Sequence, residues 1–127
     1  MEIGKAAARS VSMPAISDRA RQFIATSVPS VPWVEALLIL RAHPRQAWNA
    51  PSLAPRLYLP VAQAQELLRA LCDAGIAVHA EPAAFRYQPP DALRPVLDEV
   101  AWLYATSLVE VTQIIHDSLT LRPGDAG

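Results

Sequence analysis

The chain has 127 residues, of which 52% are hydrophobic and 18% charged. This length fits one domain with a real core, and the composition excludes wholesale disorder. No apolar run approaches the roughly 18–20 residues that cross a bilayer, and the first fifteen residues lack the apolar segment of a signal peptide. The single cysteine, Cys72, excludes an internal disulfide. We therefore expect a cytoplasmic protein that does not enter a membrane.

The net charge of −1 is distributed unevenly along the chain. Residues 1–28 carry four basic and two acidic side chains, and residues 29–88 carry five basic and four acidic ones. Residues 89–127 carry two arginines against six acids. Nucleic-acid-binding proteins usually have a basic surface, because neutralisation of phosphates dominates their affinity. The lack of a strongly basic segment therefore counts against DNA binding.

The first predicted helix follows a non-periodic segment, residues 1–15, which we expect to form a flexible tail. From Ile16 to Ser27 the apolar residues fall on one helical face, with Ser17 or Asp18 near the start. Pro29 interrupts this amphipathic helix, because the residue before a proline is displaced from helical backbone angles.

A more apolar helix is predicted after Ser30. Ser30 is a favourable cap, Pro32 is tolerated in the first turn, and the segment VEALLILRAH continues until Pro44. This helix is apolar around most of its circumference, so we expect it to be central to the core.

Two prolines complicate the next helix. Trp48 and Asn49 are predicted to form a very short strand, and the segment APSLAPRLYL follows. Pro51 and Pro55 do not both fit an ordinary helix, since an interior proline removes a hydrogen bond and clashes with the preceding turn. The helix therefore begins late with Ser52 as its cap, is kinked, or is only one turn long.

Residues 60–88 combine a helix with a β-hairpin. Pro60 opens the helix, its leucines recur with a period of 3.6 residues, and Gly75 supplies the left-handed residue that ends it. The segment IAVHAE then alternates as a strand does. We expect Glu81 to Ala84 to form the tip and residues 85–87 to form the return strand.

A long helix is predicted between about residue 92 and residue 120. Its apolar positions are spaced alternately by four and three, a heptad pattern over nearly four repeats. So long and apolar a helix favours a homodimer formed through it; the alternative is that it only folds back over the first helix. The dimer-interface candidates are Leu97, Val100, Tyr104, Leu108, Val111 and Ile115.

This order of elements indicates a mainly α (α+β) fold: a three-helix winged helix-turn-helix core with a two- to three-stranded wing, followed by the long helix. Residues 67–88 (LLRALCDAGIAVHAEPAAFRYQ) and 34–60 (VEALLILRAHPRQAWNAPSLAPRLYLP) resemble winged-helix regulators. They are similar in particular to a group of bacterial proteins of poorly defined function that end in one long helix. The resemblance covers about Val31 to Ile115 and rests on structural positions, so it implies a fold more than a function.

The domain boundaries follow from the same elements. We expect a winged-helix domain over residues 16–90, including the N-terminal amphipathic helix, a C-terminal helix over 91–120, and a tail over 121–127. The paired prolines depart from the usual second helix of the resembled proteins, which puts the DNA-supporting role of that helix in doubt.

The exposed face of the third core helix, residues 60–74, is the predicted recognition surface. Glutamine side chains can hydrogen-bond adenine edges in the major groove, and arginine can reach phosphate. The negative charges of Glu66 and Asp73 on the same face would repel phosphates. The alternative to a recognition surface is an ordinary solvated helix face. The DNA-contact candidates are Gln63, Gln65, Arg69, Arg56 and Arg86.

No catalytic, metal or cofactor site is expected. The sequence has no glycine-rich phosphate loop, and its three histidines have no Cys or His companion at ligand spacing. The first hypothesis is a dimeric winged-helix transcriptional regulator that binds duplex DNA. The alternative is a winged-helix protein–protein interaction module that meets another protein and does not bind DNA; an enzyme is a distant third.

Overall fold

The computed structural model describes residues 16–81 and 83–121. This part of the chain is mainly helical, as predicted, and has one small antiparallel sheet. The predicted tails fall outside it, except for the last residue of the final helix. The helices are α2 (Asp18–Ser27), α3 (Val31–Ala42), α4 (Ala50–Leu57), α5 (Val61–Asp73), α6 (Arg94–Thr106) and α7 (Leu108–Leu121), and the strands are β1 (Ala77–Glu81) and β2 (Ala84–Tyr87).

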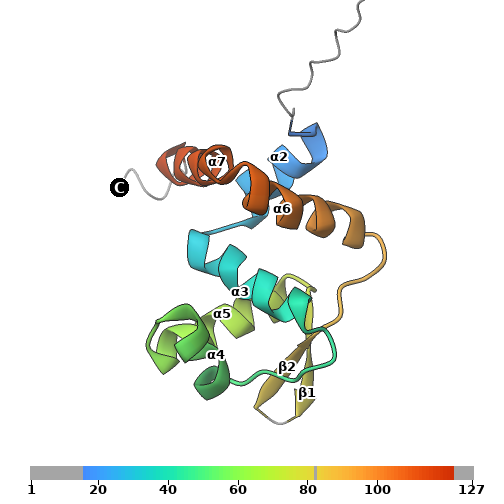
Figure 1. Ribbon diagram of the computed structural model, residues 1–127, viewed down its shortest axis with the longest axis vertical. Helices are drawn as coiled ribbons and strands as arrows, with labels where there is room; N and C mark the ends of the chain where they lie inside the picture. The colour runs from blue at the N-terminus through green and yellow to red at the C-terminus, as the bar shows by residue number, and fades with distance from the viewer. Residues whose placement is uncertain (1–15, 82, 122–127) are drawn as a thin grey trace, which may run out of the picture.

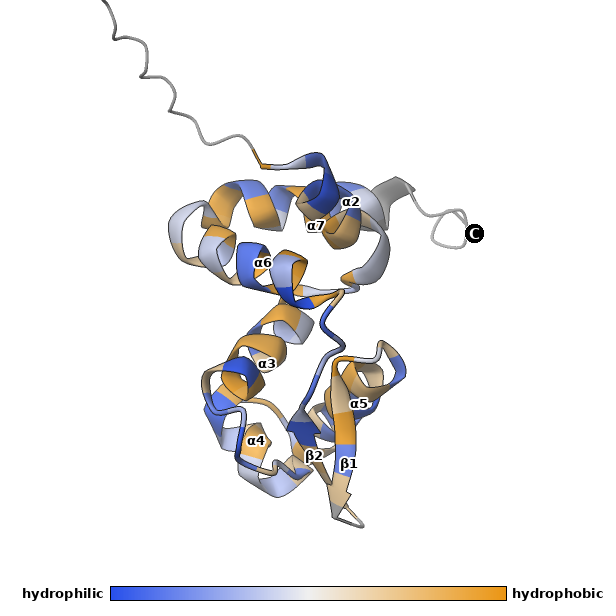
Figure 2. Ribbon diagram, turned by 90° about the vertical axis from the view of Figure 1, so that its right-hand side faces the viewer, coloured by the Kyte–Doolittle hydropathy of each residue, from blue (hydrophilic) through white to orange (hydrophobic). Residues whose placement is uncertain are grey.

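The elements form two groups. Helices α2, α6 and α7 pack together at one end of the molecule, while α3, α4, α5 and the β1–β2 hairpin form the other end (Figures 1 and 2). Helix α2 packs mainly against α6 and α7. Side-chain contacts join the groups. Arg41 donates hydrogen bonds of 3.1 and 2.9 Å to Oδ1 of Asp98, and Tyr104 donates one of 3.1 Å to Glu35. The rings of Phe23 and Trp33 lie 6.3 Å apart between centroids.

Helix α3 begins at the predicted cap, and Ser17, one of the two residues expected near the start of α2, caps that helix. The hydroxyl of Ser17 accepts a hydrogen bond from the backbone N–H of Ala20 at 3.0 Å. The hydroxyl of Ser30 accepts one from the N–H of Trp33 at 3.3 Å. Each cap satisfies an N–H that has no partner within its own helix.

The start of α4 differs from the prediction. Asn49, not Ser52, caps the helix, and the two residues exchange side-chain-to-backbone hydrogen bonds of 2.9 and 3.0 Å. This capping box lets the helix begin at Ala50 and extend over eight residues. Pro51 lies in the first turn, where its missing N–H costs nothing, and Pro55 removes only one bond of a short helix.

A glycine ends α5 and directs the chain into the hairpin. Gly75 has φ +80°, its N–H donates to the carbonyl of Cys72 at 2.9 Å, and the N–H of Ile76 donates to the carbonyl of Leu71 at 3.0 Å. These two bonds are those of the Schellman motif, which ends a helix on a left-handed residue. The predicted end of the helix is confirmed.

The hairpin is antiparallel and is extended by one bridge. His79 pairs with Phe85, and the register shifts between His79 and Glu81. The very short strand predicted at Trp48 is confirmed as a bridge, because Trp48 and Phe85 exchange two backbone hydrogen bonds of 2.7 Å. Phe85 is thus held between β1 on one side and Trp48 on the other.

The predicted single helix over residues 91–120 is corrected to two helices. The break lies at Ser107, whose backbone has φ −139° and ψ 47° and whose N–H donates to the carbonyl of Leu103. Helix α2 packs against both α6 and α7 and covers their apolar side chains. Buried in this group are Ala20, Ile24, Val96, Leu97, Val100, Leu103, Val111, Ile114 and Ile115.

Among the described residues, no single helix is both long enough and apolar enough to cross a membrane. Helices α2 and α3 meet those criteria only as a pair, and their axes are bent by 115°.

Candidate functional site

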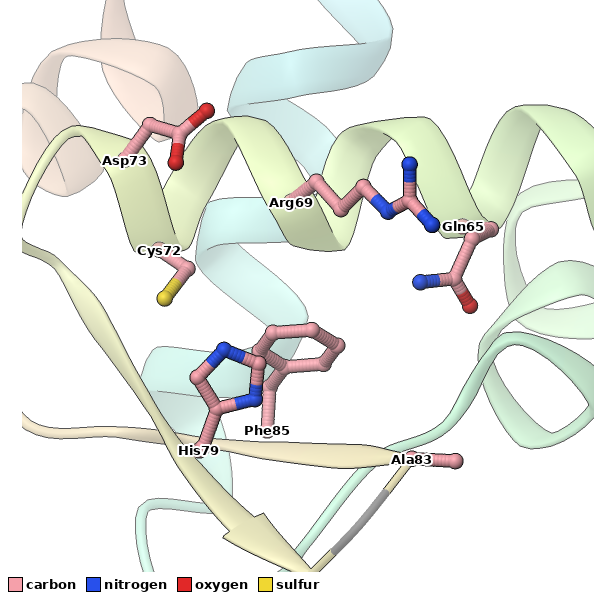
Figure 3. A pocket seen from close by; sticks show the side chains of 7 residues that line it. All are labelled: Gln65, Arg69, Cys72, Asp73, His79, Ala83 and Phe85. Atoms are coloured by element: carbon pink, nitrogen blue, oxygen red, sulfur yellow. The ribbon is translucent and has the colours of Figure 1, made fainter.

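A cleft of about 540 Å³ opens between α5 and the β1–β2 hairpin (Figure 3). It lies where the distal part of the hairpin departs from the helix. Polar and charged side chains come mainly from α5, and the aromatic surface comes from the hairpin. The lining residues are Gln65, Arg69, Cys72, Asp73, His79, Ala83 and Phe85.

The helical period of α5 places one ridge of side chains on the cleft. Gln65, Arg69 and Cys72 follow at intervals of four and three, so they share a face. Leu68 and Leu71 lie on the adjoining face and are fully buried in the core. The apolar face fixes the rotation of the helix about its axis, and the polar ridge therefore faces the cleft.

The floor of the cleft is an aromatic pair on the hairpin. The rings of His79 and Phe85 lie 4.7 Å apart between centroids, with an angle of 41° between their planes. Phe85 is buried and His79 is exposed. Figure 3 shows the imidazole of His79 extending from β1 toward α5, on the side of the cleft opposite Arg69 and Cys72.

Full charges of both signs line the cleft. Arg69 and Asp73 are exposed and lie one turn apart on α5. Over residues 16–81 and 83–121, neither of them forms an ion pair. The guanidinium of Arg69 points along the helix toward Gln65 (Figure 3). The two charges cancel, so the cleft gains a net positive charge only if the imidazole is protonated.

Two of the five predicted DNA-contact residues, Gln65 and Arg69, come together in this cleft. Gln63 lies on a different side of α5, in a second groove of about 400 Å³ that it shares with Glu66 and Trp33. Residues two apart on a helix are separated by about 200° around the axis, which is why the two glutamines do not share a face.

The other two predicted contact residues lie away from the cleft. The guanidinium of Arg56, on α4, lies over the ring of Trp48, 5.4 Å from its centroid. Arg86 pairs with Val78 in the hairpin register, so it occupies the face opposite the one that carries Phe85. Of the five predicted contact residues, Gln65 and Arg69 therefore line the cleft and the other three do not.

The six dimer-interface candidates also divide. Four are buried within the chain, with exposed fractions of 1% or less: Leu97, Val100, Val111 and Ile115. Tyr104 is half-buried, and burial together with its hydrogen bond to the Glu35 carboxylate raises its pKa to about 12. Leu108 keeps 47% of its surface exposed.

His79 is the functional candidate that the sequence interpretation missed. The alternation of side chains along the strand does not show which face of the hairpin carries His79. The pairing of His79 with Phe85 assigns it to the face that lines the cleft. Regular counting back from the Glu81–Ala84 pair would match Ala80 with Phe85; the register shift between His79 and Glu81 pairs His79 with Phe85 instead. Within the described segments, no group of three His, Cys, Asp or Glu side chains is arranged to hold a metal ion.

Comparison with known proteins adds no relative: no family model, no curated protein and no solved structure matches the chain.

Proposed function

We propose that residues 31–88 form a winged helix-turn-helix and that the protein is a transcriptional regulator that binds duplex DNA as a dimer. In this assignment α4 and α5 are the helix-turn-helix pair, α5 is the recognition helix, and the β1–β2 hairpin is the wing. The observation that carries the proposal is the cleft itself: Gln65 and Arg69 project from α5 beside the hairpin.

The connection between α4 and α5 supports this assignment. Tyr58 has φ 57° and ψ 41°, a left-handed residue that reverses the chain within one turn, and α4 packs directly on α5. Tyr58 is 93% exposed, so its conformation serves the turn and not the core. The bridge between Trp48 and Phe85 then ties the start of α4 to the hairpin.

The chemistry of the exposed ridge suits a duplex. The amide of Gln65 can donate to and accept from an adenine edge in the major groove. The guanidinium of Arg69 can pair with a phosphate or, through two hydrogen bonds, with a guanine. Because Arg69 is the one cation of α5, we expect modest affinity from one domain and a need for a second copy.

Dimerisation is proposed through the junction of α6 and α7, where large apolar side chains remain exposed. Trp102 is 55% exposed, Leu108 47% and Val109 73%. Apolar side chains of this size favour contact with another protein surface when they lie together, and aromatic residues are enriched in interfaces. The buried apolar residues of the heptad pattern are not proposed as the dimer interface, because α2 of the same chain covers them.

The second candidate function is a winged-helix module that binds another protein. The groove on the far side of α5 favours it, because that groove is lined largely by apolar residues. Its apolar residues are Pro29, Pro32, Trp33, Leu59, Leu67 and Ala70. Glu66 and Asp73, which oppose phosphates, would not impair such a role.

Binding to a labelled duplex of mixed sequence, measured by fluorescence anisotropy over a range of salt concentrations, separates the two candidates. The proposal predicts binding at low salt and a linear fall of log K with log salt concentration. A protein that remains dimeric but shows no affinity for the duplex at the lowest salt tested would favour the protein-interaction module instead.

A further inference from the structure

His79 places an imidazole in the cleft. Histidine is the side chain whose charge ordinarily changes between about pH 5 and pH 8. The imidazole of His79 is exposed and is oriented by contact with the Phe85 ring, on the wall of the cleft that faces α5. The hairpin therefore presents this imidazole on the wall of the cleft that faces α5, where it is accessible to solvent.

The surroundings of the imidazole determine what its protonation does. Of the described side chains that line the cleft with it, those that can carry charge are Arg69, Cys72 and Asp73, all on α5; Phe85 and Ala83, from the hairpin, carry none. With a neutral imidazole, the charges of Arg69 and Asp73 cancel. With a protonated imidazole, two cations on opposite walls face one carboxylate.

We infer that a backbone phosphate of duplex DNA binds in this cleft between Arg69 and protonated His79, so that DNA affinity rises as the pH falls. The inference rests on the proposed function, since it assigns the hairpin a contact with the same DNA that α5 meets. A phosphodiester fits these donors: the planar, forked guanidinium of Arg69, a single N–H of the His79 imidazolium, and the side-chain amide of Gln65. The aromatic floor formed by Phe85 carries no charge that would oppose it.

Proton linkage follows from this arrangement. If the bound phosphate favours protonated His79, complex formation near neutral pH takes up a proton, and the affinity falls as the pH rises through the range in which histidine titrates. One additional phosphate contact also changes the salt dependence. The slope of log K against log salt concentration should be steeper by about 0.9 at pH 5.5 than at pH 8.

The experiment compares the full-length protein with His79→Asn, which keeps a hydrogen-bonding side chain but cannot gain a proton. Affinity for the mixed-sequence duplex is measured at about pH 5.5 and about pH 8 at constant ionic strength. We expect roughly tenfold tighter binding at the lower pH for the original chain, from one charge-assisted hydrogen bond, and a much smaller change for the variant. His116→Asn, on α7 and outside the cleft, is the matched control and should behave as the original chain does.

Calorimetry in buffers of different ionisation enthalpy measures the number of protons taken up on binding. A purely structural role of His79 would not change that number. The original chain should take up a fraction of a proton on binding DNA near pH 7, and His79→Asn should take up less. Asp73→Asn, which removes the opposing carboxylate, should tighten binding at both pH values.

The possible outcomes separate this inference from the proposed function. DNA binding whose pH dependence, salt slope and proton uptake are the same in His79→Asn as in the original chain would overturn the inference and leave the proposed function standing. Failure of the folded protein to bind the duplex at either pH, even at low salt, would overturn both. Loss of the pH dependence in His79→Asn together with its retention in His116→Asn would support the inference.

Discussion

Ser17 and Glu99 are joined by two hydrogen bonds across 82 residues of sequence. The hydroxyl of Ser17 donates to Oε1 of Glu99 at 2.8 Å, and the backbone N–H of Ser17 donates to Oε2 at 3.3 Å. The same hydroxyl caps α2, so one serine both starts a helix and attaches it to α6. Arg19 adds a hydrogen bond of 3.4 Å to the same carboxylate.

The first prediction concerns the acid stability of this contact. Burial raises the pKa of Glu99, but the hydrogen bonds from Ser17 and Arg19 together outweigh burial and hold the pKa below its usual value of 4.5. A lowered pKa in the folded protein stabilises it above the unfolded value, and that stability is lost as the pH falls through the folded value. Glu99→Gln should therefore lower the free energy of unfolding by about 1 kcal/mol near pH 7.

Urea unfolding of both chains as a function of pH checks this prediction. The difference between the original chain and Glu99→Gln should be constant above pH 4.5 and should shrink as the pH falls below that value. A difference that persists undiminished in acid would mean that the carboxylate charge is not what holds α2 to α6.

The second prediction tests the end of α5. A Cβ atom at position 75 would meet no atom within 4 Å, but the backbone there has φ +80°, where residues with a Cβ are strained. Gly75→Ala should lower the free energy of unfolding by about 1 kcal/mol, measured by denaturant titration. Gly75→Asn should cost less, because asparagine tolerates the left-handed region better; equal costs for both would argue against a conformational origin.

The third prediction addresses oligomerisation. Trp102→Ser and Val109→Ser alter exposed side chains near the junction of α6 and α7, so the fold should be retained. Analytical ultracentrifugation should find a dimer for the original chain and a shift toward the monomer mass of 13.8 kDa for each variant. If the original chain sediments as a monomer at all concentrations, or if both variants remain dimeric, the proposed interface is wrong.

Local features of this fold were predictable because their causes lie within a few residues of sequence. A serine caps a helix by accepting a hydrogen bond from the N–H three residues later, and a glycine ends a helix by adopting a left-handed conformation; both effects depend on neighbouring residues. Ser30 and Gly75 therefore act as predicted, and Ser17, one of two residues expected near the start of α2, caps it. For α4, a late start with Ser52 as the cap was one of three alternatives, and it is wrong. Asn49 and Ser52 are both good capping residues, and the sequence alone does not choose between them.

Contacts between distant segments were harder to predict. The heptad pattern over residues 93–118 specifies an apolar stripe but not what covers it, and a second copy or α2 of the same chain can do so. The break at Ser107 has no proline or glycine to signal it. In the candidate site, helical geometry alone separates Gln63 from Gln65, whereas the contribution of His79 required the strand pairing.

The most direct test of the DNA-binding proposal is the salt dependence of duplex binding by Arg69→Ala. Arg69 is the one cation of α5 on the cleft among the described residues. Arg94→Ala, on α6 beside its partner Asp91, is the matched control. We predict that Arg69→Ala binds the duplex more weakly and that its slope of log K against log salt concentration is smaller in magnitude by about 0.9, while Arg94→Ala leaves the slope unchanged. An unchanged slope in Arg69→Ala, or no binding by the original chain at low salt, would contradict this prediction.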